Sequence, residues 1–307
     1  MRQGTDSQTQ NANYNKWRWI VLAIAFIPWV LLASRPLFGS MRSTGAFVSF
    51  LMTLIGMVII ALISAVMCYK TARQFGRGET ARWAWLLISF FSIVDGLMII
   101  TTWAPNFLPG RPLTTPLGIS SQVLAIVARG LTACSFLMMI RIYQQSGFRL
   151  KLRPFDYCAF VVLMAAEVAM VMVEGNMARI SSFGKPVLEQ WLKILLPASN
   201  LMLVVCSVLG ILIWRYARQM GGGLVAKAWQ FVVLYLVFYI IRRLELGFFG
   251  GASSLGLVIY FGLGFACSYL LYLGASFQYE ACTRSVESSD EELMAELSAL
   301  ELQEAKL

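Results

Sequence analysis

Seven ionisable side chains interrupt long apolar stretches of this sequence, and their chemistry suits the binding of a charged group. They are Asp95, Arg129, Glu167, Lys193, Arg242, Arg243 and Glu245. A charged side chain at the centre of a membrane span costs at least about 2.5 kcal/mol unless it is paired or hydrated. Charges retained there mark ligand sites, ion pathways or structural ion pairs. We therefore expect these seven side chains to form one polar site that binds a ligand.

Two interpretations of this polar site stay open at the level of sequence. Four of its side chains are basic and three are acidic. The adjacent Arg242 and Arg243 diverge by about 100° on a helix, so they cannot face one partner. One arginine would then be left for a lipid phosphate, a carboxylate ligand or a transported anion. Alternatively, closed ion pairs, such as Asp95 with Arg129 and Glu167 with Arg242 or Arg243, would only specify the helix arrangement.

Several kinds of chemistry are disfavoured by what the sequence lacks. Among its 307 residues there is no histidine, the commonest metal ligand and general base. No phosphate-binding loop, nucleophile elbow or zinc-protease motif occurs. We expect a non-enzymatic protein without a metal or cofactor. The cysteines are interpreted as buried small apolar residues rather than as a disulfide framework; they are Cys68, Cys134, Cys158, Cys206, Cys267 and Cys282.

The elements that must position these charges are membrane-spanning helices. Hydrophobic residues make up 58% of the chain and charged residues 13%, about half the charged share of a soluble domain. Stretches of about 20 mainly apolar residues predict spans. Eight are expected: Trp17–Ser34, Thr44–Tyr69, Trp83–Ala104, Gly118–Ile142, Phe155–Val173, Val187–Trp214, Ala226–Phe249 and Ser253–Phe277. The prediction is an all-α polytopic membrane protein, a bundle of about eight transmembrane helices.

The distribution of basic residues predicts the orientation of this bundle. If both termini are cytoplasmic, sixteen Lys and Arg residues flank the inner ends of the spans and five flank the outer ends. The net charge of +9 is then mainly an orientation signal, and a nucleic-acid partner is not expected. At about 1.5 Å per helical residue, the seven buried charges fall between the membrane midplane and the outer face. An outward-biased polar cavity is the expected site.

The predicted domain organisation is a bundle over residues 17–277 with two short tails. Residues 1–16 form a polar N-terminal arm whose composition favours disorder. Residues 278–307 form an acidic cytoplasmic tail. Ser289 and Glu292 have the spacing of a capping box, so a short amphipathic helix is expected from Asp290 to Glu304. Its apolar stripe, Leu293, Leu297 and Leu300, is predicted to dock a partner protein or a second copy.

These features predict a receptor or signalling-type component that binds a small anionic or lipidic ligand in an outward-biased cavity and docks a cytoplasmic partner. One alternative is a secondary transporter or channel for a small anionic solute. Another is an accessory assembly subunit of a larger membrane complex. The expected partners are membrane lipids and a protein bound through the acidic C-terminal helix.

Overall fold

A computed structural model describes residues 3–33, 44–103, 114–145, 151–181, 186–220, 223–249 and 254–304. These residues form eight α-helices and no strand. The helices are α1 (Gln3–Ala33), α2 (Thr44–Arg73), α3 (Thr80–Trp103), α4 (Thr114–Gln145), α5 (Pro154–Ser181), α6 (Pro186–Gln219), α7 (Gly223–Phe249) and α8 (Ser254–Glu304). The predicted all-helical fold class is confirmed.

Seven spans within the described residues are long and apolar enough to cross a membrane. They are Asn13–Ala33, Phe50–Arg73, Thr80–Thr102, Ile119–Gln145, Gln190–Gln219, Gly223–Glu245 and Val258–Ser285. Lipid, unlike water, tolerates the large apolar side chains that these helices leave exposed on the outside of the bundle. The chain is therefore a multi-pass helical membrane bundle.

The remaining predicted span, Phe155–Val173, is helical as part of α5 but is not among these seven. Its outer side is strongly apolar, since Phe155, Val162 and Met172 are all well exposed. An apolar exposed face is what a lipid-facing helix presents. A crossing by α5 stays a prediction.

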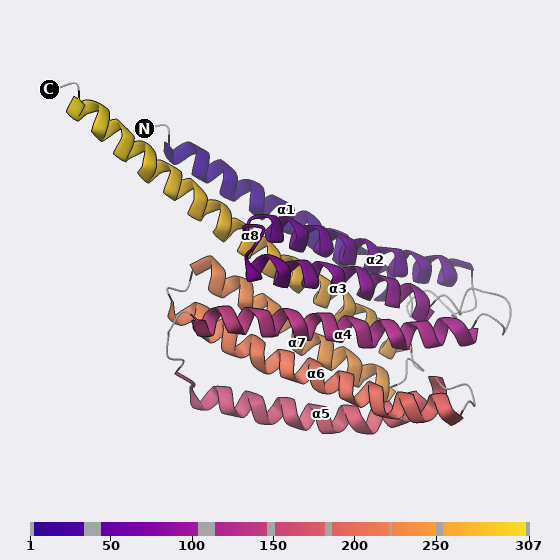
Figure 1. Ribbon diagram of the computed structural model, residues 1–307. Helices are drawn as coiled ribbons and strands as arrows, with labels where there is room; N and C mark the ends of the chain where they lie inside the picture. Colours follow the sequence, from indigo (N-terminus) through magenta and orange to yellow (C-terminus); the bar gives the residue numbers. More distant parts are fainter. Residues whose placement is uncertain are drawn as a thin grey trace.

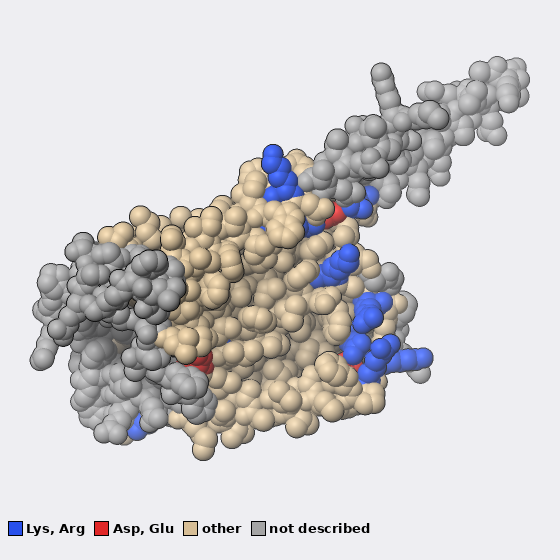
Figure 2. All heavy atoms as spheres, turned by 180° about the vertical axis from the view of Figure 1, so that it is seen from behind, with Lys and Arg blue, Asp and Glu red and all other residues tan. Residues whose placement is uncertain are grey.

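The helices lie side by side and alternate in direction, so that both chain ends emerge at the same end of the bundle (Figure 1). We call this the terminal end. Helix α8 packs against α7, α2 and α1, while α5 packs mainly against α6 and α7. On the face shown in Figure 2, most Lys and Arg atoms gather toward one end of the molecule. This agrees with the predicted sorting of basic residues, whereas the side of the membrane that they face stays a prediction.

Both tails differ from the expected local structure. Helix α1 already begins at Gln3, so the described part of the polar arm is helical rather than disordered. Helix α8 continues for 51 residues to Glu304, so no separate helix begins near Asp290. Extending an existing helix adds one hydrogen bond per residue fixed, whereas starting a new one is costly. The two polar segments therefore extend the apolar helices beside them.

Two buried ion pairs join helices near the terminal end. On α5, Asp156 accepts hydrogen bonds from Nε and Nη2 of Arg215 on α6, at 2.8 and 2.6 Å. Its second oxygen accepts the backbone N–H of Arg153 at 2.7 Å. On the other side of the bundle, Nη2 of Arg18 lies 2.7 Å from Glu280 of α8. These pairs place helix ends that apolar contacts alone would leave free to slide.

The cysteines follow the prediction only in part. All six are free thiols, and Cys68, Cys206 and Cys267 are buried as expected. Cys134 and Cys158 are exposed, which corrects the prediction that every cysteine packs inside. Cys134 lies on α4, one of the seven apolar spans, where a small apolar thiol can face lipid, and Cys158 lies on α5.

Candidate functional site

The structure buries most of the ionisable residues singled out in the sequence. Asp95, Arg129, Glu167, Arg242 and Glu245 are buried, Arg243 is half-buried, and Lys193 is exposed. Asp95 comes from α3, Arg129 from α4, Glu167 from α5, Lys193 from α6, and Arg242, Arg243 and Glu245 from α7. Lys193 thus differs from the other six in being exposed.

The exposure of Lys193 changes the charge balance expected of the site. Without it, three basic residues, Arg129, Arg242 and Arg243, face three acidic ones, Asp95, Glu167 and Glu245. The surplus of one base counted in the sequence therefore comes from a residue that is exposed, and the buried and half-buried charges are balanced in number.

Arg242 is the most tightly enclosed side chain of α7 among these residues, with 3% of its surface exposed. Its guanidinium carbon lies 4.4 Å from the centre of the Tyr260 ring on α8, a cation–π contact that covers one face. A Cβ added to Gly264, also on α8, would lie only 3.1 Å from the same carbon. Residue 264 therefore has to be small for the guanidinium to occupy this position.

One edge of the Arg242 guanidinium has no hydrogen-bond partner within the described part of the chain. Nε and Nη2 are both buried and make no hydrogen bond to a described residue. These two N–H groups point the same way and match the two oxygens of a carboxylate or phosphate. In Arg215, the same edge is filled by Asp156. The chain thus contains one buried arginine with its edge occupied by a carboxylate and a second with that edge open.

Two carboxyl groups that interact with Arg242 have buried acceptor atoms without a hydrogen-bond donor among the described residues. Asp95 interacts electrostatically with Arg242 and Arg243, and Glu245 interacts with Arg242. Among the described residues, Oδ1 of Asp95 and both carboxylate oxygens of Glu245 are buried without a hydrogen-bond donor. A buried charged group left without a hydrogen bond is strongly disfavoured. Such atoms normally indicate a bound water, ion or ligand.

Arg129 of α4 contacts α6. Its Nη1 donates to the hydroxyl of Ser199 and, at 3.5 Å, to the carbonyl of Leu196. These contacts flank Pro197, yet α6 is one continuous helix from Pro186 to Gln219. A broken helix, one mark of a transporter site, is therefore not found at this proline.

We call Asp95, Arg129, Arg242, Arg243 and Glu245 the charge cluster. Three further residues interact with it and were not identified from the sequence. Tyr239 has a buried hydroxyl and interacts electrostatically with Asp95, Arg129 and both arginines of α7. Cys267 of α8 interacts with Arg242 and Asp95. Tyr260 covers the Arg242 guanidinium. Of these three, only Tyr239 could have been identified from the sequence, because it precedes Arg242 by three residues and so lies on the same face of the helix.

The predicted docking residues Leu293, Leu297 and Leu300 lie in the backbone of α8, but their side chains lie outside the described residues. The prediction that this segment is helical is confirmed. What they contact stays a prediction.

Gly264→Ala is expected to lower stability by about 1–3 kcal/mol, because an added Cβ would crowd Met57 and the Arg242 guanidinium. Thermal unfolding in detergent measures the effect. Gly130→Ala is the matched control, since its added Cβ would meet nothing within 4 Å. The control is expected to be neutral or slightly stabilising, as alanine favours a helix more than glycine does. Equal unfolding temperatures for both variants would contradict the close packing of Arg242 on Gly264.

Comparison of the chain with protein families, curated proteins and solved structures finds no match in any of the three.

Proposed function

We propose that this protein is a receptor-type membrane component that binds a small acidic molecule at Arg242 and signals through α8 to a partner at the terminal end. The observation that carries the proposal is the open Nε–Nη2 edge of a guanidinium that is otherwise enclosed. Tyr260 covers one of its faces, and Gly264 leaves room for it. A carboxylate or phosphate supplies two oxygens in the matching geometry.

The carboxylate oxygens that interact with Arg242 limit which acidic molecules suit the site. Asp95 and Glu245 present buried oxygens without donors. They suit a ligand that carries N–H or O–H groups beside its acidic group, because each such group would satisfy one of these oxygens. Hydroxy acids, amino acids and phosphorylated alcohols have this combination. A ligand with an acidic group alone would leave the oxygens unsatisfied and add repulsion.

Helix α8 supports a signalling role for this site. Gly264, Tyr260 and Cys267 of α8 contact or interact with Arg242. The same helix continues without interruption to Glu304 and projects beyond the other helices at the terminal end (Figure 1). A ligand that moves Arg242 would press directly on this rigid element. Sixteen basic residues flank the ends assigned to the inside, so we place the projecting segment in the cytoplasm.

A panel of small acidic molecules and their neutral methyl esters tests the proposal. The purified protein is heated with each compound in excess, and its unfolding temperature is recorded. Binding to the folded state raises that temperature by mass action. We expect a hydroxy acid, amino acid or phosphorylated alcohol to stabilise the protein and its ester to have no effect. Stabilisation by acids and esters alike would refute recognition by Arg242. Uptake of the stabilising compound into proteoliposomes would instead indicate a transporter.

Deletion of residues 286–307 is expected to abolish co-purification of a cytoplasmic partner while leaving the bundle folded. The deleted part of α8 lies beyond the spanning segment Val258–Ser285, so the membrane helices keep their contacts. Affinity purification of both forms, followed by mass spectrometry and size-exclusion chromatography, measures the loss. Unchanged partners and an unchanged oligomeric state would show that this segment is not a docking element.

A further inference from the structure

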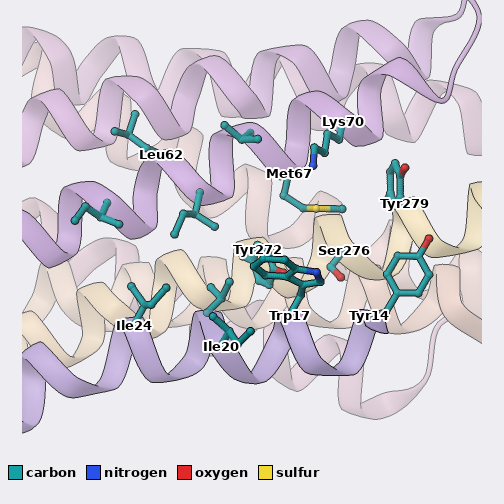
Figure 3. Close-up of a pocket in the computed structure, with 14 residues that line it drawn as sticks. Tyr14, Trp17, Ile20, Ile24, Leu62, Met67, Lys70, Tyr272, Ser276 and Tyr279 are labelled. Carbon is teal, nitrogen blue, oxygen red and sulfur yellow. The ribbon is translucent and has the colours of Figure 1, made fainter. Parts of the chain in front are cut away.

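A groove of ≈ 530 Å³ lies between α1, α2 and α8, and none of its lining residues belongs to the charge cluster around Arg242. Figure 3 shows its two chemically different ends. Away from the terminal end, the walls are aliphatic and include Ile20, Ile24, Ile59, Leu62 and Val66. Toward the terminal end they become polar and aromatic, with Tyr14, Trp17, Lys70, Ser276 and Tyr279.

The length of the groove matches one leaflet of a bilayer. Along α2, its lining runs from Ile59 to Lys70. Eleven helical steps correspond to about 16 Å, and the hydrocarbon of one leaflet is about 15 Å thick. An acyl chain lying along α2 would therefore reach from the bilayer midplane to the headgroup level, where Lys70 lies.

Next to the aliphatic end of the groove, α1 and α2 come into close contact. A Cβ added to Gly56 of α2 would lie only 2.9 Å from the Pro28 ring of α1. Thr53 of α2 donates a hydrogen bond to the Pro28 carbonyl at 3.4 Å. The lining of the groove begins one turn farther along both helices, at Ile24 and Ile59, and extends to Tyr14 and Lys70.

The polar end carries a cation that the protein itself does not neutralise. Lys70 is exposed and forms no ion pair with a described residue. The nearby cation Arg18 is already committed, since it pairs with Glu280, donates to Ser276 and lies over the Phe277 ring. Lys70 is therefore the cation of the groove that can meet an external anion. Tyrosine and tryptophan side chains beside it favour the interfacial headgroup level.

We propose that this groove binds one anionic glycerophospholipid, with an acyl chain between Ile59 and Val66 and the phosphate against Lys70. The terminal end carries the excess of basic residues and so faces the leaflet in which anionic lipids gather. The bound lipid would hold α1 against α8, two helices that already share the Arg18–Glu280 pair. This site is separate from Arg242 and does not depend on the proposed receptor function.

Native mass spectrometry with an equal mixture of phosphatidylglycerol and phosphatidylcholine tests this proposal. The wild-type protein is expected to retain one phosphatidylglycerol in preference to phosphatidylcholine. Lys70→Gln is expected to weaken phosphatidylglycerol binding about fivefold, as one basic side chain near an anionic headgroup contributes that much. Phosphatidylcholine binding should weaken less, because the choline group offsets the charge of its phosphate. Lys227→Gln, an exposed lysine of α7 outside the groove, is the matched control and should behave as wild type.

A second variant tests the acyl-chain position independently of charge. Ile59→Trp fills the aliphatic end and is expected to reduce retention of both lipids. Val162→Trp, on the exposed apolar face of α5, is expected to have no effect. The unfolding temperature of each variant confirms that it is folded. Phosphatidylglycerol binding by folded Lys70→Gln as tight as that of the wild type would overturn the proposal, and so would an equal weakening in Lys70→Gln and Lys227→Gln. Retention of both lipids by folded Ile59→Trp at the wild-type level would overturn it as well.

Discussion

Arg242→Gln is expected to abolish the stabilisation of the protein by an acidic ligand while the protein still inserts and folds. Glutamine keeps a polar side chain but loses the charge and the parallel Nε–Nη2 edge that is open in the structure. Removing one partner of a buried charged hydrogen-bonded pair costs at least about 2 kcal/mol, so affinity should fall about thirtyfold or more. The shift in unfolding temperature against ligand concentration measures the loss.

Two further variants separate recognition from folding. Arg242→Lys retains the charge without the fork and is expected to restore binding only weakly. Arg243→Gln, the adjacent half-buried arginine, is expected to leave ligand binding largely intact, because its side chain points to another side of α7. If Arg242→Gln and Arg243→Gln both prevent folding to the same extent, the cluster is a closed set of structural ion pairs and the receptor proposal is wrong.

Asp156→Asn is expected to destabilise the bundle by about 3 kcal/mol or more. The substitution leaves Arg215 buried without its charged partner, and breaking a buried pair from one side costs about 3–5 kcal/mol. It also weakens the acceptor of the Arg153 backbone N–H, which closes the first turn of α5. Thermal and denaturant unfolding in detergent provide the measurement.

A control variant and a double variant separate the loss of this ion pair from a general effect of removing a charge. Arg218→Gln replaces an exposed arginine of α6 and is expected to change stability little. The double variant Asp156→Asn with Arg215→Met is expected to recover part of the loss, because no uncompensated charge stays buried. A loss in Asp156→Asn no larger than that in Arg218→Gln would show that this ion pair does not hold α5 to α6.

Much of the architecture is predictable from local patterns. Mainly apolar stretches of membrane length predicted eight helices, because in lipid every backbone hydrogen bond must be made within the chain. Seven of them are long and apolar enough to span within the described residues. The charges within those stretches predicted where polar side chains would be buried, and five of seven are. The helical C-terminal segment was also expected, although its continuity with α8 was not.

Which charged side chains contact each other was not predictable from the sequence. These contacts depend on the angular position of each residue around its helix and on which helices become neighbours. Lys193 was included in the site on depth alone, yet it is exposed on α6. Asp95 with Arg129 was one ion pair considered from the sequence; the contacts of Asp95 with the arginines of α7 and of Arg129 with Ser199 had no signal in it. Asp156 and Arg215 belong to different helices, and no spacing in the sequence connects them.

The sequence by itself determined that this chain forms a bundle of membrane helices and which charges that bundle must accommodate, because both depend on the free energy of moving side chains from water into lipid. Only the tertiary structure decided that Arg215 is neutralised by Asp156 while Arg242 keeps an open edge. It also brought α1, α2 and α8 together around the groove ending at Lys70. Hydrogen bonds and packing contacts act over a few ångströms, so they depend on the final arrangement of helices that are distant in sequence.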